Sequence, residues 1–235
     1  MKEGTKYAGR LKTAYAKLRK EVGPVELGEM EEPLRQLGVA ILGPTIAEQR
    51  ARRAIDRAVG QMVDWNEIRV STPAQVQEAI GLEGDGVRER CRMLIRSLEA
   101  IYHRENQVSL EHLKKLPRRE ARQYLDELDG LSDYAVASVF LWSLGGHAIP
   151  LHEGLYEALR AQELVHPEAD AKTVQAFLER NVAAADAREF TVVIQALCDR
   201  TRPKSTRSRR AAASKRSAKT QTKSKRSKSS RTKAK

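Results

Sequence analysis

The sequence predicts an all-α protein that ends in a basic tail. Apolar residues recur at intervals of three and four along nearly all of the first 200 residues, which is the period of an amphipathic helix. The alternating pattern of a β-strand is scarce. The chain has 235 residues, of which 40% are hydrophobic, so it can build a substantial core. Proline, glycine and capping residues divide the body into roughly ten helices.

The last 35 residues differ sharply in composition from the rest. Residues 201–235 hold 15 of the 43 Lys and Arg and none of the 31 Asp and Glu. They contain no aromatic residue and no Val, Ile, Leu or Met, so nothing can be buried to offset the entropy of ordering them. We expect a disordered cationic tail on a body with 28 basic and 31 acidic side chains. The predicted divisions are an amphipathic helix at 1–24, an all-α body at 25–200 and the tail.

The first helices are predicted from apolar stripes and their stop signals. The first stripe ends before Gly23-Pro24 and consists of Tyr7, Leu11, Ala14, Tyr15, Leu18 and Val22. The next helix has Pro33 in its first turn, where proline is tolerated, and ends at Gly43-Pro44. Thr45 is expected to cap the third helix. The polar face of that helix carries four basic residues, Arg50, Arg52, Arg53 and Arg57.

The later helices follow the same signals. A short capped helix is expected within 71–81, followed by a long helix at 85–104. Six further helical segments are expected at 109–117, 119–128, 133–144, 152–164, 170–181 and 188–200.

A short glycine-containing link joins two of these helices in the stretch LDELDGLSDYAVASV, residues 125–139. Gly130 follows a helix that ends near Leu128, and Ser132 or Asp133 can cap the next one. Such a corner presents several backbone amides at a helix N-terminus, and a glycine lets a phosphate approach closely. Gly130, Leu131, Ser132 and Asp133 are therefore candidate phosphate-binding residues. The pattern equally fits an ordinary helical hairpin with a glycine C-cap.

The longer string from 113 to 165 resembles the helix-hairpin-helix DNA glycosylases, the endonuclease III-like repair proteins. In that family an LPGVGxKTA hairpin precedes an apolar helix and a VDTH segment. Here the corresponding strings are LDGLSDYA, AVASVFLWSLGG and AIPLHEGLYEAL. The resemblance covers about residues 25–200. It puts Thr45 near the position at which members of the family have a glutamine that fills the gap left by an extruded base. It implies a two-lobed all-α fold and binding of double-stranded DNA in base-excision repair.

The chain departs from the family at both catalytic positions. The resemblance places Tyr134 at the position of a lysine that forms a Schiff base, and His152 at the position of an aspartate. A protonated phenol cannot form an imine, and a neutral imidazole cannot replace a carboxylate. We therefore expect a catalytically inactive protein that binds duplex or damaged DNA. If the alignment shifts by one residue, Glu153, or else Asp133, could serve as the acid of an active monofunctional N-glycosylase. The simpler alternative is that Glu153 only interacts favourably with the helix dipole.

The iron–sulfur motif of the family is also missing, because Cys198 is the only cysteine near its position. No metal, iron–sulfur cluster or other cofactor is expected, and Cys198 and the distant Cys91 are expected to be reduced. The basic tail runs in place of the cluster. Its candidate DNA contacts are Lys204, Arg207, Arg209, Arg210, Lys215 and Arg216.

The remaining expectations concern partners and location. No apolar run reaches the length of a membrane span, and the first residues do not resemble a signal peptide. We expect an intracellular monomer, on the nucleoid of a bacterium or in a nucleus, with repair or chromatin proteins as further partners. A third interpretation stays open, in which the protein is an architectural component of the nucleoid or of chromatin and binds DNA mainly through its tail.

Overall fold

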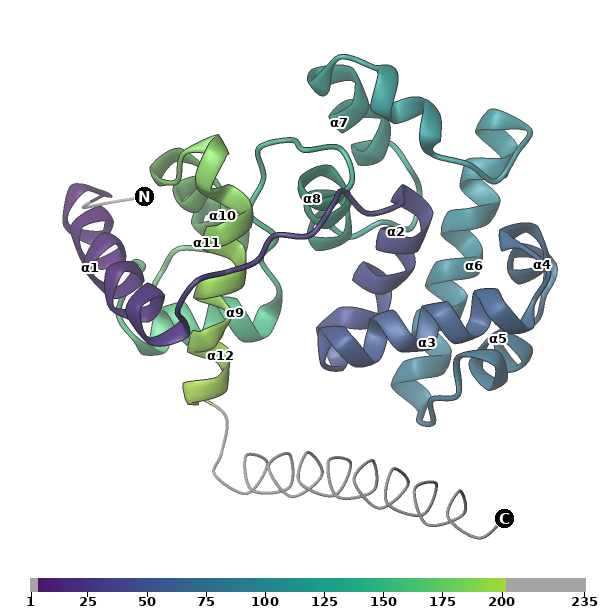
Figure 1. Ribbon diagram of the computed structural model, residues 1–235, viewed down its shortest axis with the longest axis horizontal. Coiled ribbons are helices and arrows are strands. Elements are labelled where there is room, and N and C mark those ends of the chain that lie inside the picture. Colours follow the sequence, from purple (N-terminus) through teal and green to yellow (C-terminus); the bar gives the residue numbers. More distant parts are fainter. Residues whose placement is uncertain (1–3, 202–235) are drawn as a thin grey trace, which may run out of the picture.

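The computed structural model describes residues 4–201, except for the side chains of Thr45, Asp85 and residues 199–201. This part of the chain forms twelve α-helices and three short 3-10 helices, and it contains no strand. The helices make two lobes that lie side by side (Figure 1). An all-α, two-lobed body was predicted, whereas the tail lies outside the described residues.

The first lobe is built around the longest helix, α6, against which α2, α4 and α5 pack. Its core includes Leu37, Ile55, Leu94 and Leu98, which are fully buried. The α-helices of this lobe are α2 (Pro33–Leu42), α3 (Glu48–Gln61), α4 (Trp65–Val70), α5 (Pro73–Ile80), α6 (Asp85–Glu105), α7 (Arg118–Asp126) and α8 (Asp133–Trp142), with the 3-10 helices η1 (Gly43–Thr45) and η2 (Glu111–Lys115).

The second lobe combines helices from distant parts of the sequence. It consists of α1 (Gly4–Val22), α9 (Glu153–Ala161), α10 (Ala171–Asn181), α11 (Ala187–Ile194) and α12 (Ala196–Thr201), with the 3-10 helix η3 (Ala184–Asp186). Tyr7, Leu11 and Leu18 of α1 are buried in one core with side chains of α9 to α12. The helix α1 therefore belongs to the core of this lobe.

Several helix ends lie where the sequence places them. Pro33 is the first residue of α2, and the Glu32 carboxylate accepts hydrogen bonds from the amides of Leu34 and Arg35. Thr72 and Gln75 form a reciprocal capping box at the start of α5. In residues 4–201 we find no helix that is both long enough and apolar enough to cross a membrane.

Three expectations about single elements were wrong. Thr45 does not cap α3, because residues 43–45 form the 3-10 turn η1 and the extended Ile46 separates that turn from the helix. Ala47 occupies the cap position instead. The segment expected at 109–117 is the 3-10 helix η2, and the one expected at 188–200 divides into α11 and α12 at Gln195.

The linker at 23–32 crosses from the second lobe to the first (Figure 1). Arg188 of α11 donates to the carbonyl of Gly28 at 2.7 Å, and the amide of Glu31 donates to the carbonyl of Trp142 at 3.0 Å. The Glu31 carboxylate also accepts hydrogen bonds from Arg35 and Arg52 of the first lobe. These contacts tie the linker to both lobes and restrict their relative motion.

Candidate functional site

The corner between α7 and α8 lies on the surface. Gly130 has φ of +85°, a left-handed conformation that favours glycine, and Gly130 and Leu131 are half-buried. Ser132 and Asp133 are exposed. The Ser132 hydroxyl caps α8 by accepting a hydrogen bond from the Ala135 amide at 3.2 Å. The four candidate residues thus form one continuous surface at the positive end of α8.

Each of the two acidic side chains at this corner faces a basic one. Asp129 lies 3.2 Å from Arg96 of α6, and Asp133 lies 3.6 Å from Lys172 of α10. All four side chains are largely exposed, so these ion pairs are weak and easily exchanged for other partners. The corner thus combines backbone amides with two cations and two carboxylates, and its side chains carry no net charge.

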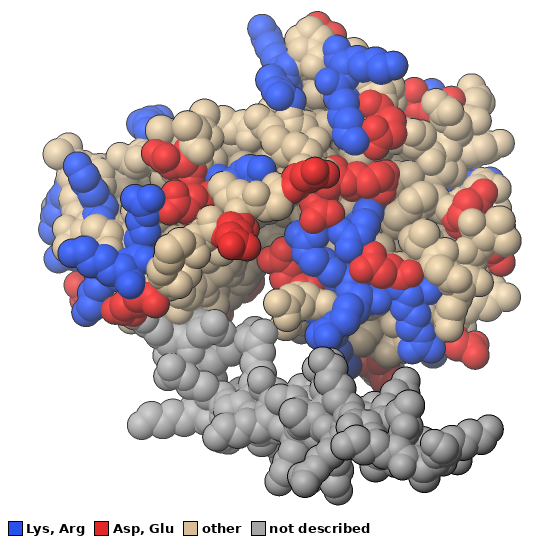
Figure 2. Space-filling model, viewed as in Figure 1, with Lys and Arg blue, Asp and Glu red and all other residues tan. Residues whose placement is uncertain are grey.

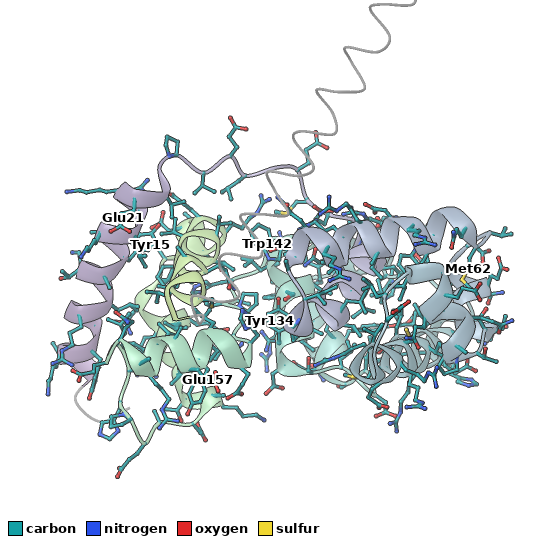
Figure 3. The ribbon with its side chains drawn as sticks, turned by 90° about the horizontal axis from the view of Figure 1, so that it is seen from below. Tyr15, Glu21, Met62, Tyr134, Trp142 and Glu157 are labelled. Carbon is teal, nitrogen blue, oxygen red and sulfur yellow. The ribbon has the colours of Figure 1, made fainter. Side chains whose placement is uncertain are left out.

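A cavity of about 150 Å³ lies between the lobes. A cavity of this size holds a single six-membered ring. In Figure 3, Tyr134 and Trp142 lie in this region between the lobes. The lining residues are Gln36, Val39, Ala40, Gly43, Glu48, Tyr134, Trp142, Pro150, Thr191, Val192 and Gln195.

Gln36 gives the cavity an unusual polar group. Its side chain is only 3% exposed, and within residues 4–201 its buried Oε1 atom has no hydrogen-bond partner. Buried acceptors are nearly always paired, because leaving one unpaired costs about 1–3 kcal/mol. Gln36 therefore brings an amide with an unpaired acceptor to the lining of the cavity.

Tyr134 and His152, the residues at the two catalytic positions of the family, lie next to each other. Their rings meet edge to face, with centroids 5.7 Å apart and planes at 83°. Burial, and to a smaller extent the nearby Glu48 carboxylate, raises the pKa of Tyr134 to about 12. The phenol is therefore protonated at neutral pH.

His152 caps the N-terminus of α9. Its Nδ1 atom accepts a hydrogen bond from the Leu155 amide at 3.2 Å, which makes it the N-cap of the helix. Its Nε2 atom lies 3.0 Å from Oε1 of Gln195. An imidazole that accepts at Nδ1 and donates at Nε2 is neutral, and both of its nitrogens are occupied.

The two acids that the sequence offers as substitutes lie outside the cavity lining. Glu153 is an exposed residue in the first turn of α9. Asp133 is exposed and pairs with Lys172. The acid that lines the cavity is Glu48, which the sequence did not single out, and its carboxylate accepts hydrogen bonds from Arg52 at 2.8 and 3.1 Å.

The remaining predicted contacts are only partly placed. Thr45 ends η1, two residues after the cavity-lining Gly43, and its side chain is not among those described. The tail candidates from Lys204 to Arg216 lie outside the described residues. The tail follows α12, however, and Gln195, just before α12, lines the cavity. Among residues 4–201, no three His, Cys, Asp or Glu side chains are placed to hold a metal ion.

Comparison with known proteins gives a clear result for the fold. No protein-family model matches the chain, and no curated protein matches it in sequence. Solved structures do match. The 8-oxoguanine glycosylase/lyase of Clostridium acetobutylicum, in complex with DNA, superposes with a TM-score of 0.64 at 13% identity, covering 86% of this chain and 72% of that one.

Two further structures agree with this match. Endonuclease III trapped in a covalent intermediate with DNA gives a TM-score of 0.62 at 13% identity, covering 80% of this chain and 84% of that one. The 3-methyladenine DNA glycosylase of H. pylori gives 0.58 at 13% identity, covering 85% and 99%. The arrangement of the helices therefore belongs to a known architecture. This chain has the fold of the helix-hairpin-helix DNA glycosylases.

Proposed function

We propose that the protein binds duplex or damaged DNA as a catalytically inactive counterpart of these glycosylases. The hairpin from Gly130 to Asp133 would hold one strand through its backbone amides. Two observations support this: the fold, and the exposure of the hairpin at the N-terminus of α8. The protein would act as a monomer on the chromosome, in a nucleoid or a nucleus, and would recruit repair or chromatin proteins.

The pair Tyr134 and His152 carries the proposal of inactivity. A Schiff base needs an unprotonated amine, and Tyr134 offers a phenol with a raised pKa. Stabilising a positively charged sugar needs a carboxylate, and His152 is neutral with both nitrogens engaged. The edge-to-face contact of the two rings supports a packing role for both side chains.

The tail supplies the attraction that the body lacks. Its fifteen cations follow α12 in the sequence, whereas the first 200 residues have a net charge of −3. If all fifteen met phosphates, the salt dependence of binding would reach a slope of about −13, which is an upper limit. We therefore assign non-specific, salt-sensitive attachment to the tail and fixed geometry to the hairpin.

A panel of lesion-containing duplexes tests this function. The protein is incubated with abasic, uracil, oxidised and alkylated duplexes, with borohydride trapping and a separate alkali step. We expect binding without base release and without a trapped adduct. Failure to bind any duplex overturns the proposal. Removal of residues 202–235 should weaken binding yet leave a preference for abasic or nicked duplex; loss of that preference favours a tail-bound architectural protein.

One observation favours a second candidate, an active monofunctional N-glycosylase. Glu48 places a carboxylate on the wall of the cavity, where Gln36 offers an unpaired acceptor. Base release by the wild type that is lost in Glu48→Gln would establish this activity. Loss in Glu153→Gln or Asp133→Asn instead would point to the acids expected from the sequence.

A further inference from the structure

Three arginines of α3 form a row on one face of that helix. Arg50, Arg53 and Arg57 are spaced by three and four residues, and all three are exposed. None of them forms an ion pair within residues 4–201. The one described hydrogen bond from this row joins Nε of Arg53 to the Gln49 carbonyl at 3.2 Å. We call these three residues the arginine row.

The neighbouring Arg52 differs from the arginine row, because its charge is paired with acidic side chains. Arg52 is turned toward the linker, where it pairs with Glu31 and Glu48. Asp56, the other acid of α3, pairs with Arg35 at 2.7 Å. The acids of α3 pair with Arg52 and Arg35, so no acid of α3 pairs with the arginine row in the part of the chain that the structure describes. Figure 2 shows basic side chains gathered over this part of the first lobe.

The position of the row relates it to the cavity. Glu48, in the first turn of α3, lines the cavity, and Arg50 follows it by two residues. At the other end, the Arg57 guanidinium lies against Gly81, in the space that a side chain there would fill. The row therefore lies on the helix whose first turn contributes Glu48 to the cavity, and it extends along the first lobe to Gly81 at the end of α5.

The spacing of the row matches a nucleic-acid backbone. Seven residues of helix span about 10.5 Å, because an α-helix rises about 1.5 Å per residue. Phosphates of one DNA strand follow each other at about 3.4 Å along the duplex axis, so the row can meet about three of them. Guanidinium groups bind phosphates with two parallel hydrogen bonds.

We propose that the arginine row binds phosphates of a second stretch of the duplex, so that the DNA is held on both sides of the cavity. This inference rests on the proposed DNA-binding function. A duplex held only at the hairpin could pivot about that contact. A second contact along α3 fixes its direction across the cavity.

The test replaces the row and measures duplex binding over a range of salt concentrations, using the full chain. The measured quantity is the slope of the logarithm of the binding constant against the logarithm of the salt concentration. In the variant Arg50→Gln/Arg53→Gln/Arg57→Gln the magnitude of this slope should fall by up to about 2.7, since each lost phosphate contact removes about 0.9. The matched control is Lys12→Gln/Lys17→Gln/Lys20→Gln, which removes the same charge from exposed positions of α1 on the far lobe. The control should leave the slope within about 0.9 of the wild type.

The outcomes separate this inference from the proposed function. If the wild type does not bind duplex DNA, the proposed function fails. If it binds and the row variant matches the control, the inference about the row is wrong and the function stands. The inference about the row is also wrong if the row variant binds duplex DNA normally and loses affinity only for single-stranded RNA. Arg53→Gln by itself, with an expected decrease of about 0.9, gives the answer if the triple variant does not fold. Ethylation interference on the wild type should map two separate groups of phosphates.

Discussion

His152 and Gln195 join the start of α9 to the junction between α11 and α12. The Nε2 atom of His152 lies 3.0 Å from Oε1 of Gln195, while Nδ1 of the same ring caps α9. The ring therefore connects α9 with the α11–α12 junction of the second lobe and packs edge to face against Tyr134. An acid at this position would keep the cap and lose the bond to the Gln195 carbonyl. The histidine thus has a structural role at the start of α9.

Restoring the two functional groups should restore covalent chemistry. In Tyr134→Lys/His152→Asp, the amine replaces the phenol in the cavity, and Asp keeps the cap because it is a preferred N-cap residue. Burial lowers the pKa of a lysine and so increases the unprotonated fraction. Borohydride should trap an adduct between this variant and an abasic duplex. Tyr134→Phe/His152→Asp is the control and should give none. A variant that binds DNA normally without any adduct would contradict the role given to position 134.

Removing the His152 cap should destabilise the second lobe. His152→Ala leaves the Leu155 amide without its acceptor, which costs about 0.5–2 kcal/mol for a typical N-cap. His152→Asn preserves a cap acceptor and should lose less. The free energy of unfolding from denaturant titration measures both. Equal stability of the alanine variant and the wild type would show that the cap contributes little.

Tyr134 should titrate late in alkaline solution. Its pKa is about 12 in the folded protein against an ordinary value of 10.0, so the fold favours the protonated phenol. The resulting stabilisation is fully present below pH 10 and is lost as the pH rises toward 12. Ultraviolet absorbance of phenolate should show a late step in the wild type that is missing from Tyr134→Phe. An unchanged titration curve in that variant would refute the assignment.

Gly130→Ala should strain the hairpin. At φ of +85° an L-residue is disfavoured by about 1–2 kcal/mol, even though the nearest side-chain atoms leave room for a methyl group at 3.5 Å. We expect a lower melting temperature and weaker binding of duplex. Gly9→Ala in α1 is a suitable control, since no atom lies within 4 Å and alanine favours the helix. Weaker binding by the control as well would remove the link to the hairpin.

Much of the fold was predictable because its signals are local. Of the predicted stripe, Tyr7, Leu11 and Leu18 are buried, Ala14 and Tyr15 are half-buried and Val22 is exposed, and α1 ends just before Gly23. Ser132 caps α8 as one of the two predicted caps. The corner between α7 and α8 lies where the resemblance put the hairpin, and the apolar helix is α8 itself. Periodicity and capping depend on residues within one turn of each other, so the sequence reveals them directly.

The cavity was harder to predict because its walls come from separate elements. Gln36 of α2, Glu48 of α3 and Gln195 lie in segments with no catalytic pattern, and only packing of the two lobes brings them together. Thr45 illustrates the same limit, since a threonine before a helix usually caps it, yet here a 3-10 turn intervenes. The different roles of Arg52 and Arg53 also depend on the linker, which is remote in sequence from α3.

The origin of the second lobe has a consequence for how the chain folds during synthesis. Its core joins α1 with α9 to α12, so α1 leaves the ribosome long before its partners exist. The first lobe runs from α2 to α8 as one continuous stretch of sequence. It can therefore fold while Tyr7, Leu11 and Leu18 of α1 are still uncovered. Newly made chains should therefore pass through a stage in which the first lobe is formed and the apolar face of the amphipathic helix α1 is still exposed.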